Sequence, residues 1–275
     1  VAASEQAPRK HAGAAVPAMM PEEITVREAR GPARFILIVC AIIVPLLAMN
    51  QLLNLQFFVG AVLIDPRYLF LLASLLLPLV FIAVPANGSA RGTTPWYDWI
   101  CAASAFGILV WFAVHAERGL LEGWEYSSPP LAKAFSGVLC LLVLEALRRT
   151  SGWPMTVIVG TLALYPVVAH VLPNPLRGLN HTFENTIAYH VASSESLFGI
   201  PMRAFAEIVI GFIIFGLTLN HTGGGRFFND LAFALVGRVR GGAAQVGVIS
   251  SGLQGSISGS VISNVISSGV VTIPA

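Results

Sequence analysis

Apolar residues occur in long runs along most of this chain, and short polar segments separate the runs. A helix needs about twenty apolar residues to cross the hydrocarbon core of a bilayer. Six runs have or approach that length, and each is predicted to be a membrane-spanning helix: Arg34–Leu55, Arg67–Val84, Trp96–His115, Leu131–Leu147, Pro154–Leu172 and Arg203–Asn220. The pattern predicts an all-α polytopic membrane protein.

The residues before the first run have a different character. Residues 1–33 are rich in Ala, Pro and charged side chains without periodicity, which predicts a disordered tail. A cleaved signal peptide is the alternative for the segment that ends at Leu55. The long preceding arm and the lack of a small-residue cleavage site favour a retained membrane anchor instead.

A second type of helix is predicted after the sixth run. Residues Phe227 to Arg240 mix apolar and polar side chains at helical spacing. Phe227, Leu231 and Leu235 share one face, and Asp230 lies away from it. This pattern is typical of an amphipathic helix that lies along the membrane surface.

The last segment, Gly241 to Ala275, has no charged side chain and is crowded with Ser and Gly. Two half-length helices are predicted in it, Ala243–Leu253 and Ser258–Val271, with a break at Gln254–Ile257. Neither is long enough to cross a bilayer alone, so the segment is interpreted as a re-entrant helical hairpin. One bent span with small-residue packing faces is the alternative.

The predicted break gathers oxygen-bearing side chains, namely Ser256, Ser258, Ser260 and Asn264. A broken helix also exposes backbone carbonyls, and neutral oxygens suit a hard cation such as Na⁺. Small residues also allow close helix packing without any ion. From the residues alone, both interpretations stay open.

Composition narrows the class of protein. The chain is 55% hydrophobic and 11% charged, with a net charge of +2, whereas soluble proteins are about a quarter charged. Because its few cations lie in short loops, no nucleic-acid partner is expected. No enzyme is expected either: an intramembrane serine protease needs a Gly-x-Ser-Gly loop and a histidine base, but Ser256 stands where the first Gly belongs and no histidine follows His221.

Loop charges predict the orientation of the spans. Arginines gather before the first span and after every second span, at Arg91, Arg148, Arg149 and Arg226 among others, whereas the other loops carry acidic residues such as Glu122. Positive loops face the cytoplasm. The amino terminus and the segment after His221 are therefore predicted to be cytoplasmic. Glu145 is expected to pair with Arg148, and Glu207 in the sixth span is expected to make an interhelix contact rather than bind an ion.

Several motifs together resemble one transporter family. The Ser/Gly-rich run from Gly241 to Pro274 is similar to the signature of the large membrane subunit of tripartite ATP-independent periplasmic (TRAP) transporters. Upstream motifs agree, at Leu144–Gly152, Leu197–Pro201, Phe212–Gly216, Gly223–Phe228 and Val236–Arg238. The resemblance is specific from about Leu141 onward, and before that it rests on the number of spans.

The resemblance implies a permease in which small and large membrane subunits are fused, with four spans in the first and twelve in the second. Residues 34–150 would be the four-helix small-subunit-like domain, and residues 151–275 the amino-terminal part of the large transport domain. Such a permease lies in the bacterial inner membrane and imports small organic acids. It takes its substrate from a periplasmic solute-binding protein, is driven by a sodium gradient, and moves an elevator-like domain against a static scaffold.

By position, Ser258, Gly259, Ser260 and Asn264 match the first hairpin tip of that family, which contributes to a sodium site. Ser256 and Ser260 are the candidate substrate contacts. The family has a second hairpin that this sequence does not contain, so the resemblance implies an incomplete large domain that does not transport alone. A non-transporting structural membrane scaffold is the alternative function.

Overall fold

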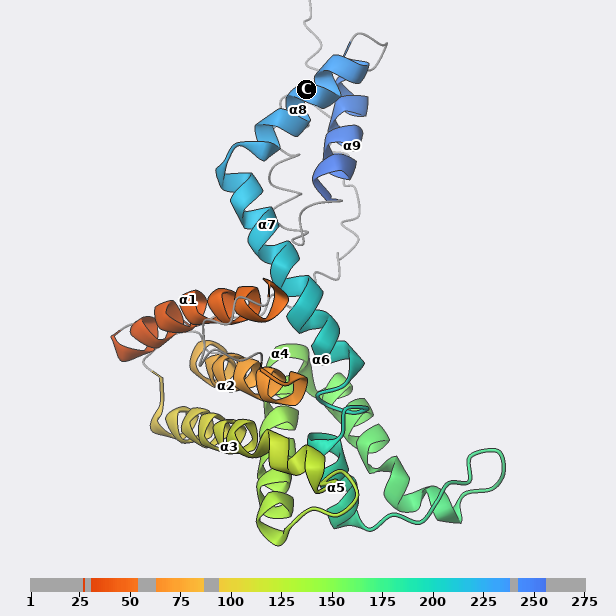
Figure 1. The fold of residues 1–275 in the computed structure, drawn as a ribbon. Coiled ribbons are helices and arrows are strands. Elements are labelled where there is room, and N and C mark those ends of the chain that lie inside the picture. Colours follow the sequence, from red (N-terminus) through yellow and green to blue (C-terminus); the bar gives the residue numbers. More distant parts are fainter. Residues whose placement is uncertain (1–26, 28–30, 54–62, 87–93, 238–241, 256–275) are drawn as a thin grey trace, which may run out of the picture.

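The computed structural model describes residues 27, 31–53, 63–86, 94–237 and 242–255, and these residues form helices and short connections without any strand. Five described helices are long and apolar enough to cross a membrane. The chain is therefore an all-α polytopic membrane protein, as predicted. Most of the helices form a bundle, from which the last helices extend (Figure 1).

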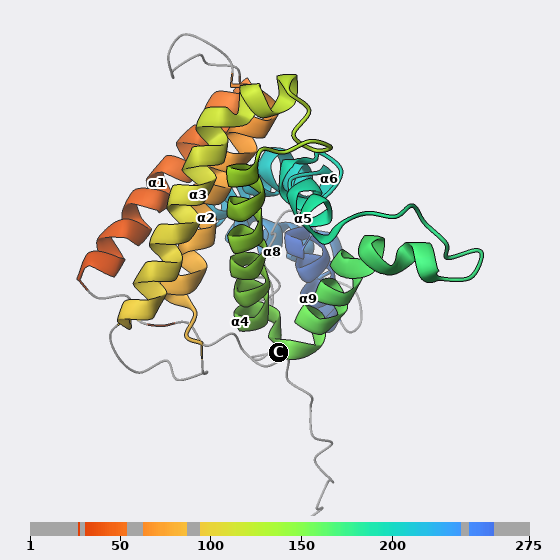
Figure 2. The same ribbon diagram turned by 90° about the horizontal axis from the view of Figure 1, so that it is seen from below.

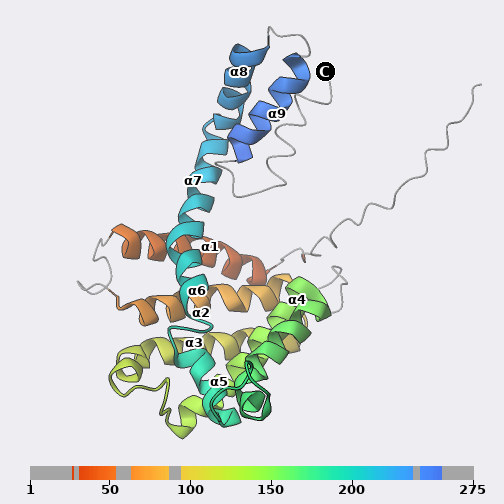
Figure 3. The ribbon, with the colours of Figure 1, turned by 90° about the vertical axis from the view of Figure 1, so that its right-hand side faces the viewer.

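The bundle begins with three long helices that lie side by side. They are α1 (Pro32–Leu53), α2 (Asp65–Ala83) and α3 (Trp96–Leu121), and α2 lies between the other two (Figures 1 and 3). Small buried residues, Ala73 on α2 and Ala105 and Ala113 on α3, are consistent with close approach of these helices. Larger buried side chains, among them Leu72 and Leu109, fill the core.

The fourth and fifth predicted spans form two helical segments, which carry one label and meet at a sharp bend. Helix α4 runs from Pro130 to Val168, and a 3₁₀ turn, η1 (Ala169–Val171), extends it. A straight helix of 42 residues would be about 60 Å long, twice the thickness of a membrane core. Within α4, the backbone of Gly152 has φ 78° and ψ 176°, and this conformation is not helical. The two predicted spans are therefore two helical segments that meet at Gly152, which lies between the predicted ends, Leu147 and Pro154.

The local sequence explains this bend. A glycine adopts a positive φ at little cost, and it commonly ends a helix there. Pro154 follows two residues later, where its missing N–H is tolerated at the start of a new helical segment. The second segment of α4 then turns away from the first and runs back beside it at an angle (Figure 2).

A short helix, α5 (Phe183–Ala192), lies between the two segments of α4 (Figure 2). Thr182 caps its amino terminus by accepting a hydrogen bond from the backbone N–H of Asn185. Beyond α5, the chain forms α6 (Ile200–Ala204), the π-helical turn η2 (Phe205–Val209) and α7 (Ile210–His221) as one continuous rod. This rod is the sixth predicted span, begun three residues earlier than Arg203.

The rod passes α1 and leaves the bundle steeply (Figures 1 and 3). At its far end α8 (Gly224–Val236) packs against α9 (Gly242–Gly255). Helix α8 confirms the predicted amphipathic helix, beginning three residues before Phe227, and α9 shows that the residues of the first predicted half-length helix are helical. The second half-length helix, Ser258–Val271, lies outside the described residues.

Other predicted boundaries moved. Helix α3 continues six residues beyond the predicted end at His115, and α1 begins two residues before Arg34. Of the predicted tail, residues 1–26 and 28–30 lie outside the described part; Arg27 is buried, and Pro32 and Ala33 belong to α1.

Candidate functional site

The predicted ion-binding and substrate-binding residues lie outside the part of the chain that the structure describes. They are Ser256, Ser258, Gly259, Ser260 and Asn264. The structure does describe the two helices that lead to them, and the described part of α9 reaches Gly255, directly before Ser256. Helices α8 and α9 are therefore the described elements that lie next to the candidate site along the chain.

Helices α8 and α9 form a compact pair through small and medium side chains. Ala232 on α8 and Val246 and Ser250 on α9 are completely buried. The described residues of α9, Gly242–Gly255, lead directly to the candidate site residues.

The rod that carries this pair contacts the bundle through a buried tyrosine. The Tyr68 hydroxyl on α2 donates a hydrogen bond of 3.1 Å to the Ala206 carbonyl in η2. Tyr68 is 2% exposed. A π-helical turn interrupts the regular hydrogen bonds of a helix, and such turns often occur at functional positions. Glu207 follows Ala206 and is exposed, and its expected interhelix contact stays a prediction.

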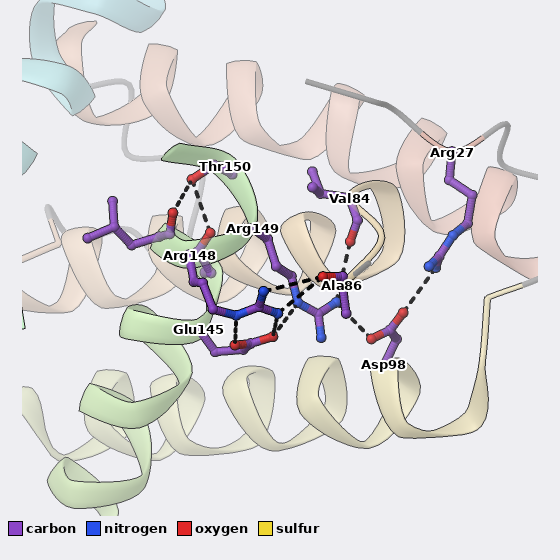
Figure 4. Close-up of polar contacts among 10 residues, drawn as sticks. Arg27, Val84, Ala86, Asp98, Glu145, Arg148, Arg149 and Thr150 are labelled. Carbon is purple, nitrogen blue, oxygen red and sulfur yellow. Dashed lines mark hydrogen bonds and ion pairs between the residues drawn. The ribbon is translucent and has the colours of Figure 1, made fainter. Parts of the chain in front are cut away.

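Most of the buried charge lies at one end of the bundle, which we call the arginine end because Arg27, Arg148 and Arg149 lie there (Figure 4). Asp98, in the first turn of α3, has a side chain that is fully buried. Its Oδ2 accepts a hydrogen bond of 3.0 Å from Arg27, and its Oδ1 accepts one of 2.7 Å from Arg149.

Glu145 extends this chain of ion pairs toward the surface. It accepts hydrogen bonds from Nε of Arg149 at 2.8 Å and from Nε of Arg148 at 2.7 Å. The predicted pairing of Glu145 with Arg148 is thus confirmed. Charges of opposite sign alternate from Arg27 through Asp98, Arg149 and Glu145 to Arg148, so each buried charge has a partner.

The same arginines satisfy the carboxyl end of α2. The backbone N–H of Arg27 donates to the Ala83 carbonyl at 2.7 Å. Arg149 donates to the Val84 carbonyl, and Arg148 to the Ala86 carbonyl, each at 3.3 Å. The last carbonyls of a helix lack partners within the helix and attract cations. The arginine end therefore connects four segments: the arm at Arg27, α2, α3 and α4.

The opposite end of the bundle contains a small cavity of about 160 Å³. Its walls include Phe70 of α2, Phe198 between α5 and α6, and the side chain of Arg203. Arg203 pairs with Asp65 at 3.3 Å. Ligand pockets for small molecules have volumes of about 300–1,000 Å³, so this cavity is too small to be a substrate site by itself.

Sequence reasoning missed Asp98, Arg149 and Tyr68 as points where helices are joined. Asp98 is 71 positions from Arg27 and 51 from Arg149, so no local spacing relates them. A single acidic residue in the first turn of a helix is common, so the position of Asp98 did not single it out. Among the described residues, no group of three or more His, Cys, Asp or Glu side chains forms a metal cluster.

Comparison with known proteins adds one finding. The family model for the DctM component of the tripartite ATP-independent periplasmic transporter matches residues 138–275. The match begins within the first segment of α4 and covers the bend, the rod and the helices α8 and α9. No curated protein and no solved structure matches the chain.

Proposed function

The chain belongs to the family of the DctM component of tripartite ATP-independent periplasmic transporters, and from this premise we propose that it is the permease of a sodium-coupled importer of small organic acids. Proteins of this family work with a periplasmic binding protein and a small membrane component. The observation that carries the proposal is the family match over residues 138–275, which includes the uncharged Ser/Gly-rich segment.

We further propose that the chain fuses the two membrane components. Residues 34–150 serve as the small component, and residues 151–275 begin the large one. The bend at Gly152 supports this division because the chain changes direction there. In the proposed elevator mechanism, the first four spans belong to the static scaffold and the helices after the bend lead into the moving domain.

The proposed sodium site lies at the break that follows α9. Ser258, Ser260 and Asn264 supply side-chain oxygens, Gly259 lets the backbone carbonyls approach the ion, and Ser256 and Ser260 contact the substrate. The family match over this segment supports the proposal, because it includes all of these residues. The ion would couple substrate binding to the sodium gradient.

The loop charges of the sequence support an orientation with the amino terminus in the cytoplasm. Arg148 and Arg149 lie at the arginine end beside Arg27, whereas at the opposite end Arg67 and Arg118 are paired with Glu117 and Glu122. Positive residues favour the cytoplasmic side. The opposite end, with α5, would then face the periplasm, where the solute-binding protein docks.

The test is uptake by the full-length permease in liposomes, with its binding protein and an inward sodium gradient. We expect Ser260→Ala and Asn264→Ala to raise the sodium concentration needed for half-maximal uptake. Ser267→Ala, in the same segment but away from the predicted break, is the matched control. Unchanged sodium dependence in both variants would refute the site, and no sodium-driven uptake of any organic acid would favour the scaffold function.

A further inference from the structure

A groove of about 420 Å³ lies between α5 and the first segment of α4, two helices that lie side by side (Figure 2). Its volume is within the range of sites that hold small molecules, about 300–1,000 Å³. The floor of the groove is apolar, with Ala134 and Gly137 from α4 and Phe183 and Ile187 from α5. The groove lies near the start of α4, whereas Arg149 and the arginine end lie at the other end of the same segment.

Gly137 keeps the middle of the floor open. Nothing lies within 4 Å of a Cβ built at this position. One helical turn further, Leu141 lies on the same face of α4 and is 69% exposed. The apolar floor therefore continues along the exposed face of a helix that is long and apolar enough to cross the membrane. In a bilayer such a face contacts acyl chains.

Lys133 and Glu184 place two opposite charges in the lining of this groove. Their Nζ and Oε2 atoms are 3.8 Å apart, which is longer than a hydrogen bond. An ammonium has three donors and a carboxylate has two acceptor oxygens, so this contact leaves both groups able to bind a further partner. The side chains are 28% and 75% exposed, so a molecule in the surrounding bilayer can reach them.

The charges and the apolar floor lie at different depths along the helix. The first segment of α4 begins at Pro130, so Lys133 lies about 5 Å and Gly137 about 10 Å along the helix axis from this end. The end of a spanning helix lies at the level of the lipid headgroups, and residues further along lie beside the acyl chains. The groove thus combines a pair of charges near the headgroups with an apolar floor near the hydrocarbon.

We propose that the groove binds a membrane phospholipid whose headgroup carries both a phosphate and a primary ammonium, as in phosphatidylethanolamine. The phosphate accepts hydrogen bonds from Lys133, the ammonium donates to Glu184, and one acyl chain lies over Gly137 toward Leu141. The two charges of the headgroup complement the two charges of the groove, which favours this lipid over an apolar segment of protein. The bound lipid connects α4 with α5. The inference rests on the membrane-spanning fold and not on sodium coupling.

The experiment is a lipid titration of the delipidated full chain in detergent micelles, followed by native mass spectrometry. Phosphatidylethanolamine, phosphatidylcholine and phosphatidylglycerol with identical acyl chains serve as probes. We expect phosphatidylethanolamine to bind most tightly, because the quaternary ammonium of phosphatidylcholine has no N–H to donate and the headgroup of phosphatidylglycerol has no cation. Glycerophosphoethanolamine, which has no acyl chain, should not displace the bound lipid.

Gly137→Leu tests the floor of the groove, because the new side chain occupies the space of the acyl chain. We expect it to raise the dissociation constant of phosphatidylethanolamine about tenfold, since it displaces roughly two methylene groups of the lipid from the groove. Gly107→Leu is the matched control. Gly107 is an exposed glycine of α3 with nothing within 4 Å of a Cβ built there, and its replacement should leave the dissociation constant unchanged.

Two further variants test the charges. Glu184→Gln removes the negative charge that receives the ammonium, so it should weaken the binding of phosphatidylethanolamine about threefold without weakening that of phosphatidylglycerol. Lys133→Gln should weaken the binding of all three lipids, because each of them carries a phosphate. Lys133→Arg keeps the positive charge and should keep the binding.

Equal affinities for the three lipids in the native chain, or unchanged lipid binding in Gly137→Leu, would overturn the inference. A dimer in the mass spectra that is lost in Gly137→Leu, while lipid binding is unchanged, would assign the groove to a second copy of the chain. Ala134→Leu occupies the same floor and replaces Gly137→Leu where the latter does not fold. The titration needs neither a binding protein nor a sodium gradient, so its failure is distinct from a failure of the transport proposal.

Discussion

Asp98 and Glu145 bind three arginines at the arginine end. The last carbonyls of α2, which lack partners within the helix, lie there too. The environment of each ion pair decides how much it contributes. A buried charge that loses its partner cannot be solvated, whereas an exposed one can. At the residue scale, the consequences of substitution therefore differ sharply between the two ends of the bundle.

Replacement of Asp98 should be costly. Asp98→Ala leaves two buried guanidinium groups without their shared partner, and we expect it to lower the free energy of unfolding by about 3–5 kcal/mol. Glu184→Ala removes a pair with Lys133 that has an exposed carboxylate and a distance of 3.8 Å, with an expected loss of at most about 1 kcal/mol. Denaturant unfolding in detergent micelles compares them; equal losses would show that burial does not decide the difference.

Gly152 should tolerate no side chain. Its φ of 78° with ψ of 176° lies in a region that is essentially restricted to glycine, so Gly152→Ala should cost about 1–3 kcal/mol. Gly137, in the first segment of α4, is the control: nothing lies within 4 Å of a Cβ built there. Gly137→Ala should be neutral or stabilising in the same unfolding measurement, and a neutral Gly152→Ala would contradict the assigned bend.

Glu122 offers a test by pH, because it lies just beyond the end of α3 and outside the spans. Hydrogen bonds from the Arg118 guanidinium at 2.6 Å and the Trp124 indole at 2.8 Å lower the pKa of its carboxyl. Since the folded pKa lies below the unfolded one, the stabilising effect of this contact is present above the ordinary glutamate pKa. It is lost as the pH falls through the lowered value.

The measurement for Glu122 is the pH dependence of tryptophan fluorescence. The change that is absent in Glu122→Gln is the one that reports the contact of Glu122 with Trp124. We expect the midpoint to lie below the ordinary pKa of glutamate and to rise in Arg118→Ala. Glu117→Gln, which removes the partner of Arg67, should leave the midpoint in place. A midpoint that does not respond to Arg118→Ala would show that the guanidinium does not lower this pKa.

At the scale of elements, the two segments of α4 form a V that is held at its apex and within its opening. The arginine end holds the apex, and α5 lies in the opening (Figure 2). Lys133 and Cys140 of the first segment approach Glu184 and the Ile187 carbonyl of α5. The second segment meets α5 through His190. The two segments of α4 are therefore held together at the bend and also by α5, a short helix between them that is not one of the candidate membrane spans.

His190 should be needed to keep α5 in this position. Its Nε2 lies 2.8 Å from the Ala163 carbonyl, which only accepts, so Nε2 carries a hydrogen, and its Nδ1 lies 2.6 Å from Ser196 Oγ. We expect His190→Ala to speed hydrogen exchange across residues 183–199, since the contact with the second segment is lost. His170→Ala, at an exposed histidine, is the control, and equal exchange in both variants would contradict this role.

At the scale of the whole molecule, the described helices divide into a bundle and an extension. The bundle has a continuous buried core, whereas α7 beyond η2 is largely exposed (Figures 1 and 3). Tyr68 joins the two parts by its hydrogen bond to Ala206. Both ends of the bundle carry charges of both signs: Arg27, Arg148 and Arg149 bind Asp98 and Glu145 at one end, and Arg67, Arg118 and Arg203 each pair with a carboxylate at the other.

The proposed orientation predicts which residues are accessible from outside the cell membrane. In a chain without native cysteines, Tyr126→Cys should react with a membrane-impermeant thiol reagent added to intact spheroplasts. Arg34→Cys should react only after permeabilisation, and both side chains are exposed. The opposite pattern would reverse the proposed orientation, while leaving the fold unaffected.

Much of the fold was predictable because a span is a local property of the sequence. Runs of apolar residues identified α1, α2, α3 and the α6–α7 rod to within six residues at the described ends. The amphipathic pattern identified α8, and the uncharged small residues identified α9. The candidate sodium site, from Ser256 to Asn264, lies outside the described residues and stays a prediction.

The sequence by itself determined that the chain is helical, that it lies in a membrane, and to which family it is similar, because hydropathy and motifs need no partner to be recognised. Only the tertiary structure decided how the helices are joined. It placed Arg27 and Arg149 on one carboxylate, linked two predicted spans across Gly152, and set α5 between them. Those contacts join residues far apart along the chain. How much each contact stabilises the fold depends on burial, which no local sequence pattern reveals.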